Sequence, residues 1–223
     1  MLALAPVLPA SRLQPQLSSF PPLLSPTGLA FPRGRITEIY GEPSSGRTSF
    51  LINTLAEATR CGETCAWVDL DNTFDPVSAA AAGVRLDRLL WIRCTGDAPA
   101  AMRCTDLLLA ANGFGVVVVD LGDADKRVIQ RIPPNYWYRF RRAVEPTRTV
   151  VVVVSQDPIA RQCATLSVES RRVETKWSGT AGVSQLLDGV ELRYEPRKPV
   201  GTPRAGLTVS ARPTLENILE PVA

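Results

Sequence analysis

The sequence predicts an α/β fold in which a mainly parallel central β-sheet is flanked by helices and followed by an antiparallel C-terminal hairpin. Strand-like and helix-like segments alternate at spacings that suit right-handed βαβ crossovers. Two runs, 116–120 and 149–155, consist mostly of valine. Unbroken β-branched runs of this kind are typical of strands buried on both faces of a parallel sheet. A glycine-bracketed loop at 41–48 joins the first strand to the first helix.

The expected elements follow one another from residue 35. Besides the two valine runs, hydrophobic patterning indicates strands at 36–40, 65–70 and 89–93, and helices at 49–60, 75–82, 98–111 and 139–144. Asn112-Gly113 is a helix C-cap signal. After residue 183 two short strand-like segments, 189–194 and 206–212, are separated by prolines. We interpret them as a hairpin at the sheet edge.

The chain length suits one domain with a substantial core. Of its 223 residues, 45% are hydrophobic and 21% charged, which is the balance of an ordinary globular protein. We expect a flexible Pro/Ser/Leu-rich segment at 1–32, a core at 33–215 and a C-terminal tail at 216–223. Within the first segment, a short apolar piece at 20–24 is expected to pack on the domain or on a partner.

Composition excludes several functional classes. The chain has no histidine, which rules out Ser-His-Asp and Cys-His catalysis and most zinc-enzyme geometries. Five irregularly spaced cysteines indicate reduced thiols rather than a disulfide framework. A formal net charge of +3 means that nucleic acid would have to be contacted by a local basic patch. Because no apolar run approaches the roughly 18 residues of a spanning helix, we expect a cytoplasmic protein without a membrane partner.

The loop Gly41-Glu42-Pro43-Ser44-Ser45-Gly46-Arg47-Thr48 follows the pattern G-x4-G-K-[ST], with Arg47 at the lysine position. In that pattern backbone N–H groups and the helix N-terminus bind phosphate, and the Ser/Thr hydroxyl ligates Mg²⁺. We therefore expect the loop and the following Ser49 to bind ATP. Arginine keeps the charge but positions a γ-phosphate less well than lysine. The alternative is a Ser/Gly-rich turn that never meets phosphate.

Asp120 strengthens the case for nucleotide binding. It ends the valine run 116–119, at the strand end where open α/β sheets bind ligands. From the Walker-B position an aspartate reaches Mg²⁺, so Thr48 and Asp120 are the predicted metal-binding residues. An N-cap or turn aspartate is the alternative interpretation.

Two further polar residues follow predicted strands. Asp71 lies just past the strand at 65–70, where a carboxylate could orient the attacking water. Asp69 and Asp75 are the alternatives, with Asp75 favoured as a helix cap. Gln156 follows the second valine run and is placed to sense a γ-phosphate. An exposed polar strand end explains Gln156 equally well.

A basic, aromatic stretch occupies 131–142. Positive charge interleaved with aromatics is what single-stranded nucleic acid binding uses, through phosphate contacts and base stacking. The candidate contacts are Arg131, Tyr136, Trp137, Arg139 and Arg142. The favoured alternative is an amphipathic helix capped by Asn135, with Tyr136, Phe140 and Val144 facing the sheet; both hold if the arginines face DNA.

A second basic cluster lies further along the chain. Arg171, Arg172 and Lys176 stand beside Trp177. We interpret this cluster as the solvated face of a helix with an aromatic anchor.

These motifs resemble a known family. Residues 33–41, running into Ser44-Ser45-Gly46, resemble the bacterial recombinase RecA around its Walker A motif, and 65–69, 75–76 and 83–90 follow that family's next βα unit. The resemblance covers roughly 28–156 well and extends to 212 only loosely. It implies a RecA-like P-loop NTPase core that binds ATP and Mg²⁺. The family's water-activating glutamate is matched by Asp71, so with Arg47 we expect ATP binding with weak or absent hydrolysis.

The chain is also similar to the short, divergent RecA-like proteins typified by ImuA, through 163–166, 171–172 and 177–179. That group implies DNA repair or SOS translesion mutagenesis, single-stranded DNA, and a Y-family polymerase-like or RecA-like protein partner. Two rival functions stay open. One is an active, filament-forming, DNA-dependent ATPase recombinase; the other is a non-catalytic RecA-like scaffold. A homo-oligomer is left open as well.

Overall fold

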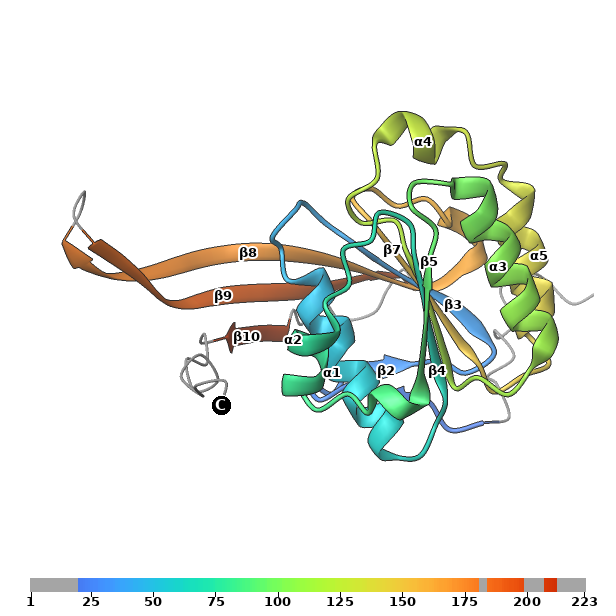
Figure 1. Cartoon of the computed structure of the whole chain (residues 1–223), viewed down its shortest axis with the longest axis horizontal. Helices are drawn as coiled ribbons and strands as arrows, with labels where there is room; N and C mark the ends of the chain where they lie inside the picture. Colours follow the sequence, from blue (N-terminus) through green and yellow to red (C-terminus); the bar gives the residue numbers. More distant parts are fainter. Residues whose placement is uncertain (1–19, 181–183, 199–206, 212–223) are drawn as a thin grey trace, which may run out of the picture.

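The computed structural model describes residues 20–180, 184–198 and 207–211, and within them a helix-flanked β-sheet dominates (Figure 1). The strands of this sheet are β3 (Arg35–Tyr40), β4 (Cys65–Asp69), β5 (Leu89–Arg93), β6 (Val116–Asp120), β7 (Val150–Ser155), β8 (Ala164–Thr180), β9 (Ser184–Lys198) and β10 (Leu207–Ala211). The helices are α1 (Arg47–Arg60), α2 (Pro76–Ala81), α3 (Ala98–Ala111), α4 (Lys126–Gln130) and α5 (Asn135–Val144), with 3-10 turns η2 (Leu86–Arg88) and η3 (Arg161–Cys163).

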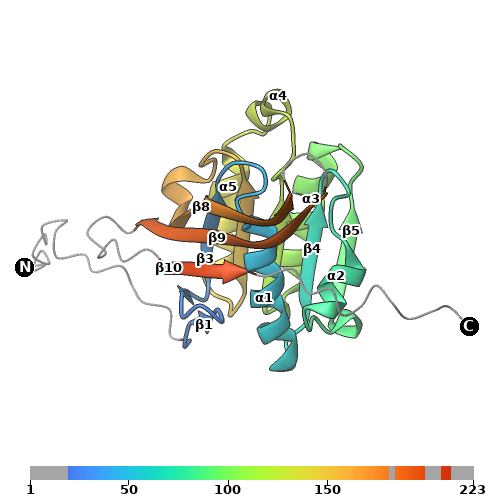
Figure 2. The same cartoon turned by 90° about the vertical axis from the view of Figure 1, so that its left-hand side faces the viewer.

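The described sheet has the strand order β10-β9-β8-β3-β7-β6-β4-β5. Strands β3 to β8 pair in parallel, whereas β8, β9 and β10 pair antiparallel, and Figure 2 shows these three strands side by side. The predicted fold class, a mainly parallel sheet with antiparallel C-terminal strands, is therefore confirmed.

The two valine runs form the centre of the core. Along β6 and β7 alternate valines enter two different hydrophobic clusters, one under α3 and α5 and the other under α1. Val116 and Val118 pack on the α1 side, while Val117 and Val119 pack on the α3 and α5 side. Period-two side-chain alternation explains why both faces of these strands are apolar.

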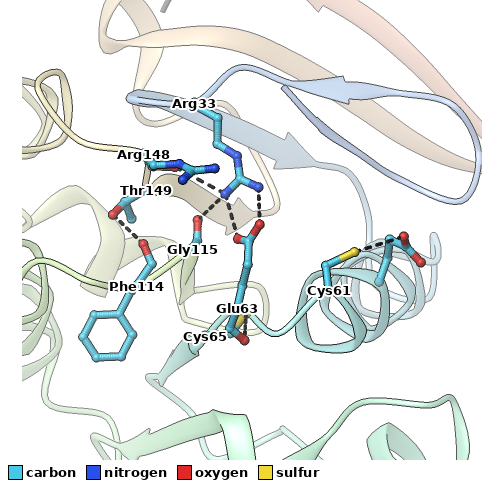
Figure 3. A network of polar contacts seen from close by, with 9 residues as sticks. Arg33, Cys61, Glu63, Cys65, Phe114, Gly115, Arg148 and Thr149 are labelled. Atoms are coloured by element: carbon cyan, nitrogen blue, oxygen red, sulfur yellow. Dashed lines mark hydrogen bonds and ion pairs between the residues drawn. The ribbon is translucent and has the colours of Figure 1, made fainter. Parts of the chain in front are cut away.

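A network of hydrogen bonds and ion pairs joins the segments that lead into the parallel strands (Figure 3). Arg33 is buried and donates to Glu63 Oε2 at 2.8 Å, to the Gly115 carbonyl at 3.2 Å and to the Arg148 carbonyl at 3.3 Å. Thr149 donates to the Phe114 carbonyl at 2.6 Å. These residues precede β3, β4, β6 and β7. The network thereby holds the N-terminal ends of four neighbouring strands together. The loops that follow these strands lie at their C-terminal ends, on the opposite side of the sheet.

Strands β8 and β9 form a ribbon that extends beyond the body of the domain (Figure 1). The ribbon includes 171–177, so the prediction of a helical face there is wrong. Trp177 is 56% exposed on β8 and pairs across the ribbon with Leu187. The charged residues of this segment alternate with apolar ones only weakly, and pairing with β9, rather than local preference, determines their conformation.

The ends of the chain are only partly covered by the described residues. Within 20–24, Leu23 is buried and belongs to β1 (Leu23–Leu24), which pairs antiparallel with β2 (Ala30–Phe31). This segment packs on the domain, as expected. Residues 1–19 of the segment 1–32 that was predicted to be flexible, and the predicted tail at 216–223, lie outside the described residues. In the described part of the chain, no helix has the length and apolar character needed to span a membrane.

Candidate nucleotide-binding site

The phosphate loop connects β3 to α1, and the sign of the backbone φ angle alternates along part of it. Ser44 and Gly46 have φ values of 61° and 88°, whereas Ser45 between them stays outside the left-handed region. Alternation of this kind turns successive N–H groups toward one centre and forms an anion-binding nest. The first helical bond of α1 runs from the Phe50 N–H to the Gly46 carbonyl at 3.0 Å. The three preceding N–H groups therefore have no intrahelical acceptor and suit a phosphate.

The outer side of the loop is held by β8 and β9. Ser170 Oγ donates to the Ser45 carbonyl at 2.6 Å, and the Tyr194 hydroxyl donates to the Gly46 carbonyl at 3.1 Å. Burial raises the pKa of Tyr194 to about 12, so the phenol stays a donor. A Cβ at Gly46 would lie 2.4 Å from Leu192 Cδ1, which explains why glycine is needed here. Sequence reasoning missed these supports because they lie 125 and 148 residues from their partners.

Arg47 is turned toward the sheet. Its side chain is buried, and Nη1 donates to the Ser155 carbonyl at 2.7 Å and to the Gly122 carbonyl at 3.1 Å. Nη2 lies 3.7 Å from Asp123 Oδ1. Burial lowers the pKa of Arg47, and Asp123 and Asp120 oppose this effect. The guanidinium therefore links the start of α1 to the ends of β6 and β7.

Asp120 lies at the end of β6, as predicted, and is 6% exposed. Its Oδ1 accepts a hydrogen bond from the Gly122 N–H at 3.0 Å. Burial raises the pKa of Asp120 to about 7, although the Gly122 N–H favours the ionised form. A buried carboxylate of this kind is stabilised by a nearby cation.

The predicted metal ligands offer the oxygen donors that Mg²⁺ prefers. Thr48 is exposed in the first turn of α1, and Asp120 supplies the carboxylate. Among the described residues no group of three or more acidic or cysteine side chains could hold a metal ion. Mg²⁺ is usually bound by one or two carboxylates together with waters and substrate phosphates. The pair therefore fits Mg²⁺ that arrives with a nucleotide.

Two of the three aspartates near β4 have structural roles. Asp69 is buried and accepts hydrogen bonds from the Thr73 and Phe74 N–H groups at 3.1 and 3.0 Å, and from Trp91 Nε1 at 3.0 Å. Asp75 caps α2 by accepting from two N–H groups of its first turn, which confirms the predicted cap. Neither carboxylate is free to act on a ligand.

Asp71 is the remaining aspartate of this group. It is exposed just past β4, and partial desolvation raises its pKa together with the charges of Asp123 and Asp69. Asp123 itself is half exposed beside Arg47. Sequence reasoning passed over Asp123, although its position three residues after the β6 aspartate was a usable signal. The structure thus groups Asp71, Asp120 and Asp123 around the Arg47 side of the loop.

Gln156 follows β7 and lines a cavity of about 470 Å³ beside the phosphate loop. Gly41, Glu42 and Pro43 of the loop also line it, as do residues of β8. The loop and Gln156, far apart in sequence, therefore line one cavity. The role of Gln156 as a γ-phosphate sensor stays a prediction.

Comparison with known proteins agrees with this geometry. The family profile described as the RecA N-terminal domain matches residues 25–126, from just before β2 to the start of α4. The matched segment contains the phosphate loop, Asp71 and Asp120. This part of the chain is similar to the RecA N-terminal domain.

Individual relatives match over part of their length. RecA of Laribacter hongkongensis (strain HLHK9) is 32% identical over 139 residues, which cover 56% of this chain and 39% of that protein. RecA of Ectopseudomonas oleovorans is 44% identical over 90 residues, covering 40% of this chain and 25% of that protein. The chain thus spans about two-fifths or less of these RecA proteins.

A solved structure extends the likeness in fold. The crystal structure of the RadB recombinase superposes with a TM-score of 0.60 at 18% identity, over 82% of this chain and 89% of that one. At this identity the match concerns the fold alone, including the C-terminal part beyond the matched RecA segment.

Most of the basic, aromatic stretch forms a helix, α5, with a buried face. Trp137, Phe140 and Val144 of α5 are buried, so the amphipathic alternative describes the helix better. The prediction that Trp137 stacks on bases is wrong, since its ring is only 5% exposed within the core. The predicted cap at Asn135 is wrong too, because the helix begins there and Pro134 is the N-cap.

The polar side of α5 is divided between engaged and exposed arginines. Arg139 forms an ion pair with Asp106 of α3 and stacks 4.9 Å from the centroid of the half-buried Tyr136 ring. Arg142 of α5 is exposed, and so is Arg131, which is the C-cap of α4 and precedes α5. Of the three predicted arginine contacts, all are exposed, and Arg139 is the one that forms an ion pair with Asp106.

Proposed function

We propose that this chain is a RecA-family ATP-binding protein of DNA repair or recombination that hydrolyses ATP slowly or not at all. The observation that carries the proposal is a phosphate loop with the nest conformation whose basic residue, Arg47, is hydrogen-bonded to the Gly122 and Ser155 carbonyls. Such a loop can bind phosphates with its backbone. It lacks a side-chain cation that reaches them freely.

The remaining residues have defined parts in this proposal. The N–H groups of 46–49 would bind the phosphates, while Thr48 and Asp120 would hold Mg²⁺. Bound Mg²⁺ would neutralise phosphate charge. Asp71 would orient the attacking water, and Gln156 would contact the outer phosphate. Because aspartate is one methylene shorter than glutamate, Asp71 holds a water less closely, and a misplacement of about 1 Å can cost on the order of a hundredfold in rate.

The proposal extends to partners. Single-stranded DNA is the expected nucleic acid, contacted through Arg131 and Arg142. The resemblance to ImuA-type proteins supports translesion mutagenesis with a Y-family polymerase-like partner as the finer form of this function.

Thermal unfolding with nucleotide tests the binding step. ATP with Mg²⁺ should raise the melting temperature, because a ligand at about 100 times its Kd stabilises the folded state by about 2.7 kcal/mol. Thr48→Ala removes an exposed hydroxyl and should leave the free protein's melting temperature in place while reducing the shift. If ATP shifts neither protein, the chain is a scaffold that has lost nucleotide binding.

Phosphate release tests the hydrolysis step. Turnover with single-stranded DNA should stay far below the 1–100 s⁻¹ that is typical of phosphoryl-transfer enzymes such as kinases. Rapid DNA-stimulated hydrolysis, with nucleoprotein filaments visible by electron microscopy, would instead identify an active recombinase.

A further inference from the structure

The cavity beside the phosphate loop has a feature that the loop pattern does not explain. Ser45 is 2% exposed and lines this cavity, and its Oγ has no hydrogen-bond partner among the residues that the structure describes. Leaving a buried hydroxyl unpaired costs about 1–3 kcal/mol. A ligand that accepts a hydrogen bond from Ser45 would remove this cost.

Strand β8 brings Arg172 to the same cavity. Residues directly opposite each other in an antiparallel pair project from the same face. Ser170 is opposite Tyr194 and Arg172 is opposite Leu192. Ser170 and Tyr194 hydrogen-bond the loop, and Leu192 contacts Gly46. Arg172 is therefore the next loop-facing residue along β8.

A β-bulge strengthens this placement. The register of β8 against β9 shifts between Arg172 and Glu174. Bulges re-aim side chains and are frequent beside functional sites. Here the bulge directly follows Arg172, at the rim of the cavity, and pairing resumes at Glu174.

The other charges of the cavity are largely compensated. Glu169 forms ion pairs with Arg171 at 2.6 Å and with Arg197 at 2.7 Å, and Asp157 pairs with Lys126 at 2.8 Å. Arg172, by contrast, makes no ion pair in the described part of the chain. Its guanidinium is thus available to an anion.

Glu42 is the one lining carboxylate that opposes an anion. It is exposed at the leading end of the loop, where solvent screens its charge. The cavity therefore combines one available guanidinium, one unpaired hydroxyl donor and one screened carboxylate.

We propose that this cavity is an anion subsite for the outermost phosphate of a nucleoside triphosphate, with Arg172 supplying the positive charge and Ser45 a hydrogen bond. The inference rests on the proposed nucleotide binding. It assigns to Arg172 of β8 the cationic contact that Arg47, held by the Gly122 and Ser155 carbonyls, does not make. Guanidinium–phosphate contacts are short and charge-assisted, so one arginine can serve.

Calorimetric titration with ATP, ADP and inorganic phosphate tests the subsite on the full chain. Arg172→Ala should weaken ATP binding about tenfold, which corresponds to about 1.4 kcal/mol, while ADP binding changes less than twofold. Ser45→Ala should weaken ATP binding severalfold without lowering the melting temperature of the free protein. Glu42→Gln should tighten ATP binding. Arg193→Ala is the matched control: it lies on β9 opposite Arg171, pairs with Glu195 at 3.3 Å and should change neither affinity.

The outcomes separate this inference from the proposed function. If the wild-type protein binds ATP and Arg172→Ala weakens ATP and ADP equally or not at all, the subsite is wrong and nucleotide binding stands. If the wild-type protein binds no ATP, both are overturned. Binding of inorganic phosphate alone that depends on Arg172, without ATP binding, would identify a free-anion site and overturn the nucleotide assignment.

Discussion

At the scale of single residues, Arg47 decides how the site behaves. Its Nη1 donates to two backbone carbonyls, Gly122 and Ser155, and the ammonium of a lysine, on a flexible stem that reaches less far than a guanidinium, is not held between them in the same way. Arg47→Lys should therefore release the cation toward the phosphates and raise ATP turnover on the order of tenfold to a hundredfold. The same change should lower the free energy of unfolding by about 1–3 kcal/mol, because charged hydrogen bonds to buried carbonyls are lost.

Steady-state phosphate release and urea unfolding measure these two effects. Arg60→Lys, on the exposed end of α1, is the matched control and should alter neither. Stability that falls while turnover stays unchanged would mean that the rest of the site no longer supports hydrolysis.

The residues that could be predicted are those whose signal is local. The loop pattern, Asp120 and Gln156 each follow a recognisable strand, and the Asp75 cap precedes a proline that begins a helix. Tyr194 and Ser170 could not be found in this way, because their contact with the loop depends on pairing between distant strands. Trp137 was misassigned for a similar reason: periodicity alone does not tell which ring of an aromatic run enters the core.

At the scale of elements, Glu38 couples β3 to the connection that follows β7. It is 1% exposed, and its Oε1 accepts hydrogen bonds from the Ile159 N–H at 2.5 Å and the Ala160 N–H at 2.7 Å. Burial raises the pKa of Glu38, and these hydrogen bonds oppose the rise. Because the folded-state pKa is the higher one, Glu38 contributes stability at low pH that is lost as pH rises through the raised pKa.

Glu38→Gln should show this linkage. The glutamine can accept from the same two N–H groups but does not ionise, so the variant should gain stability relative to wild type between about pH 5 and about pH 8. Urea unfolding of both proteins at the two pH values gives the comparison. A stability difference that is the same at both pH values would show that Glu38 binds its proton equally in the folded and unfolded states.

Elements with strong intrinsic patterns were predicted well. The range of α3 and those of β5 and β6 agree with the structure, since proline, aspartate and glycine signals bound them and their apolar pattern is unambiguous. Strand β8 was missed at 171–177, where charged residues hide the period of two. Its conformation comes from continuous pairing with β9, which has no local signature.

At the scale of the whole molecule, the order of the strands in the sheet brings the predicted site residues together. The strands β3, β7, β6 and β4 are neighbours, so the loop, Gln156, Asp120 and Asp71 meet at their C-terminal ends. The Arg33 network fixes the opposite ends. Order along the sheet could not be obtained from the sequence alone, because it depends on which strands pair, whereas the direction of each βαβ unit follows from chirality.

Charge at this scale also bears on DNA. With a formal net charge of +3, the molecule does not attract nucleic acid as a whole, so binding should depend on a few exposed arginines. The double variant Arg131→Ala/Arg142→Ala should weaken single-stranded DNA binding and reduce the slope of log K against log salt by roughly 1.4, since each phosphate contact contributes about 0.7. Fluorescence anisotropy across a salt series measures that slope. Arg60→Ala/Arg85→Ala removes the same formal charge from exposed positions elsewhere and should leave it unchanged. Equal losses in the two double variants would mean that DNA responds only to total charge, and that Arg131 and Arg142 do not contact it.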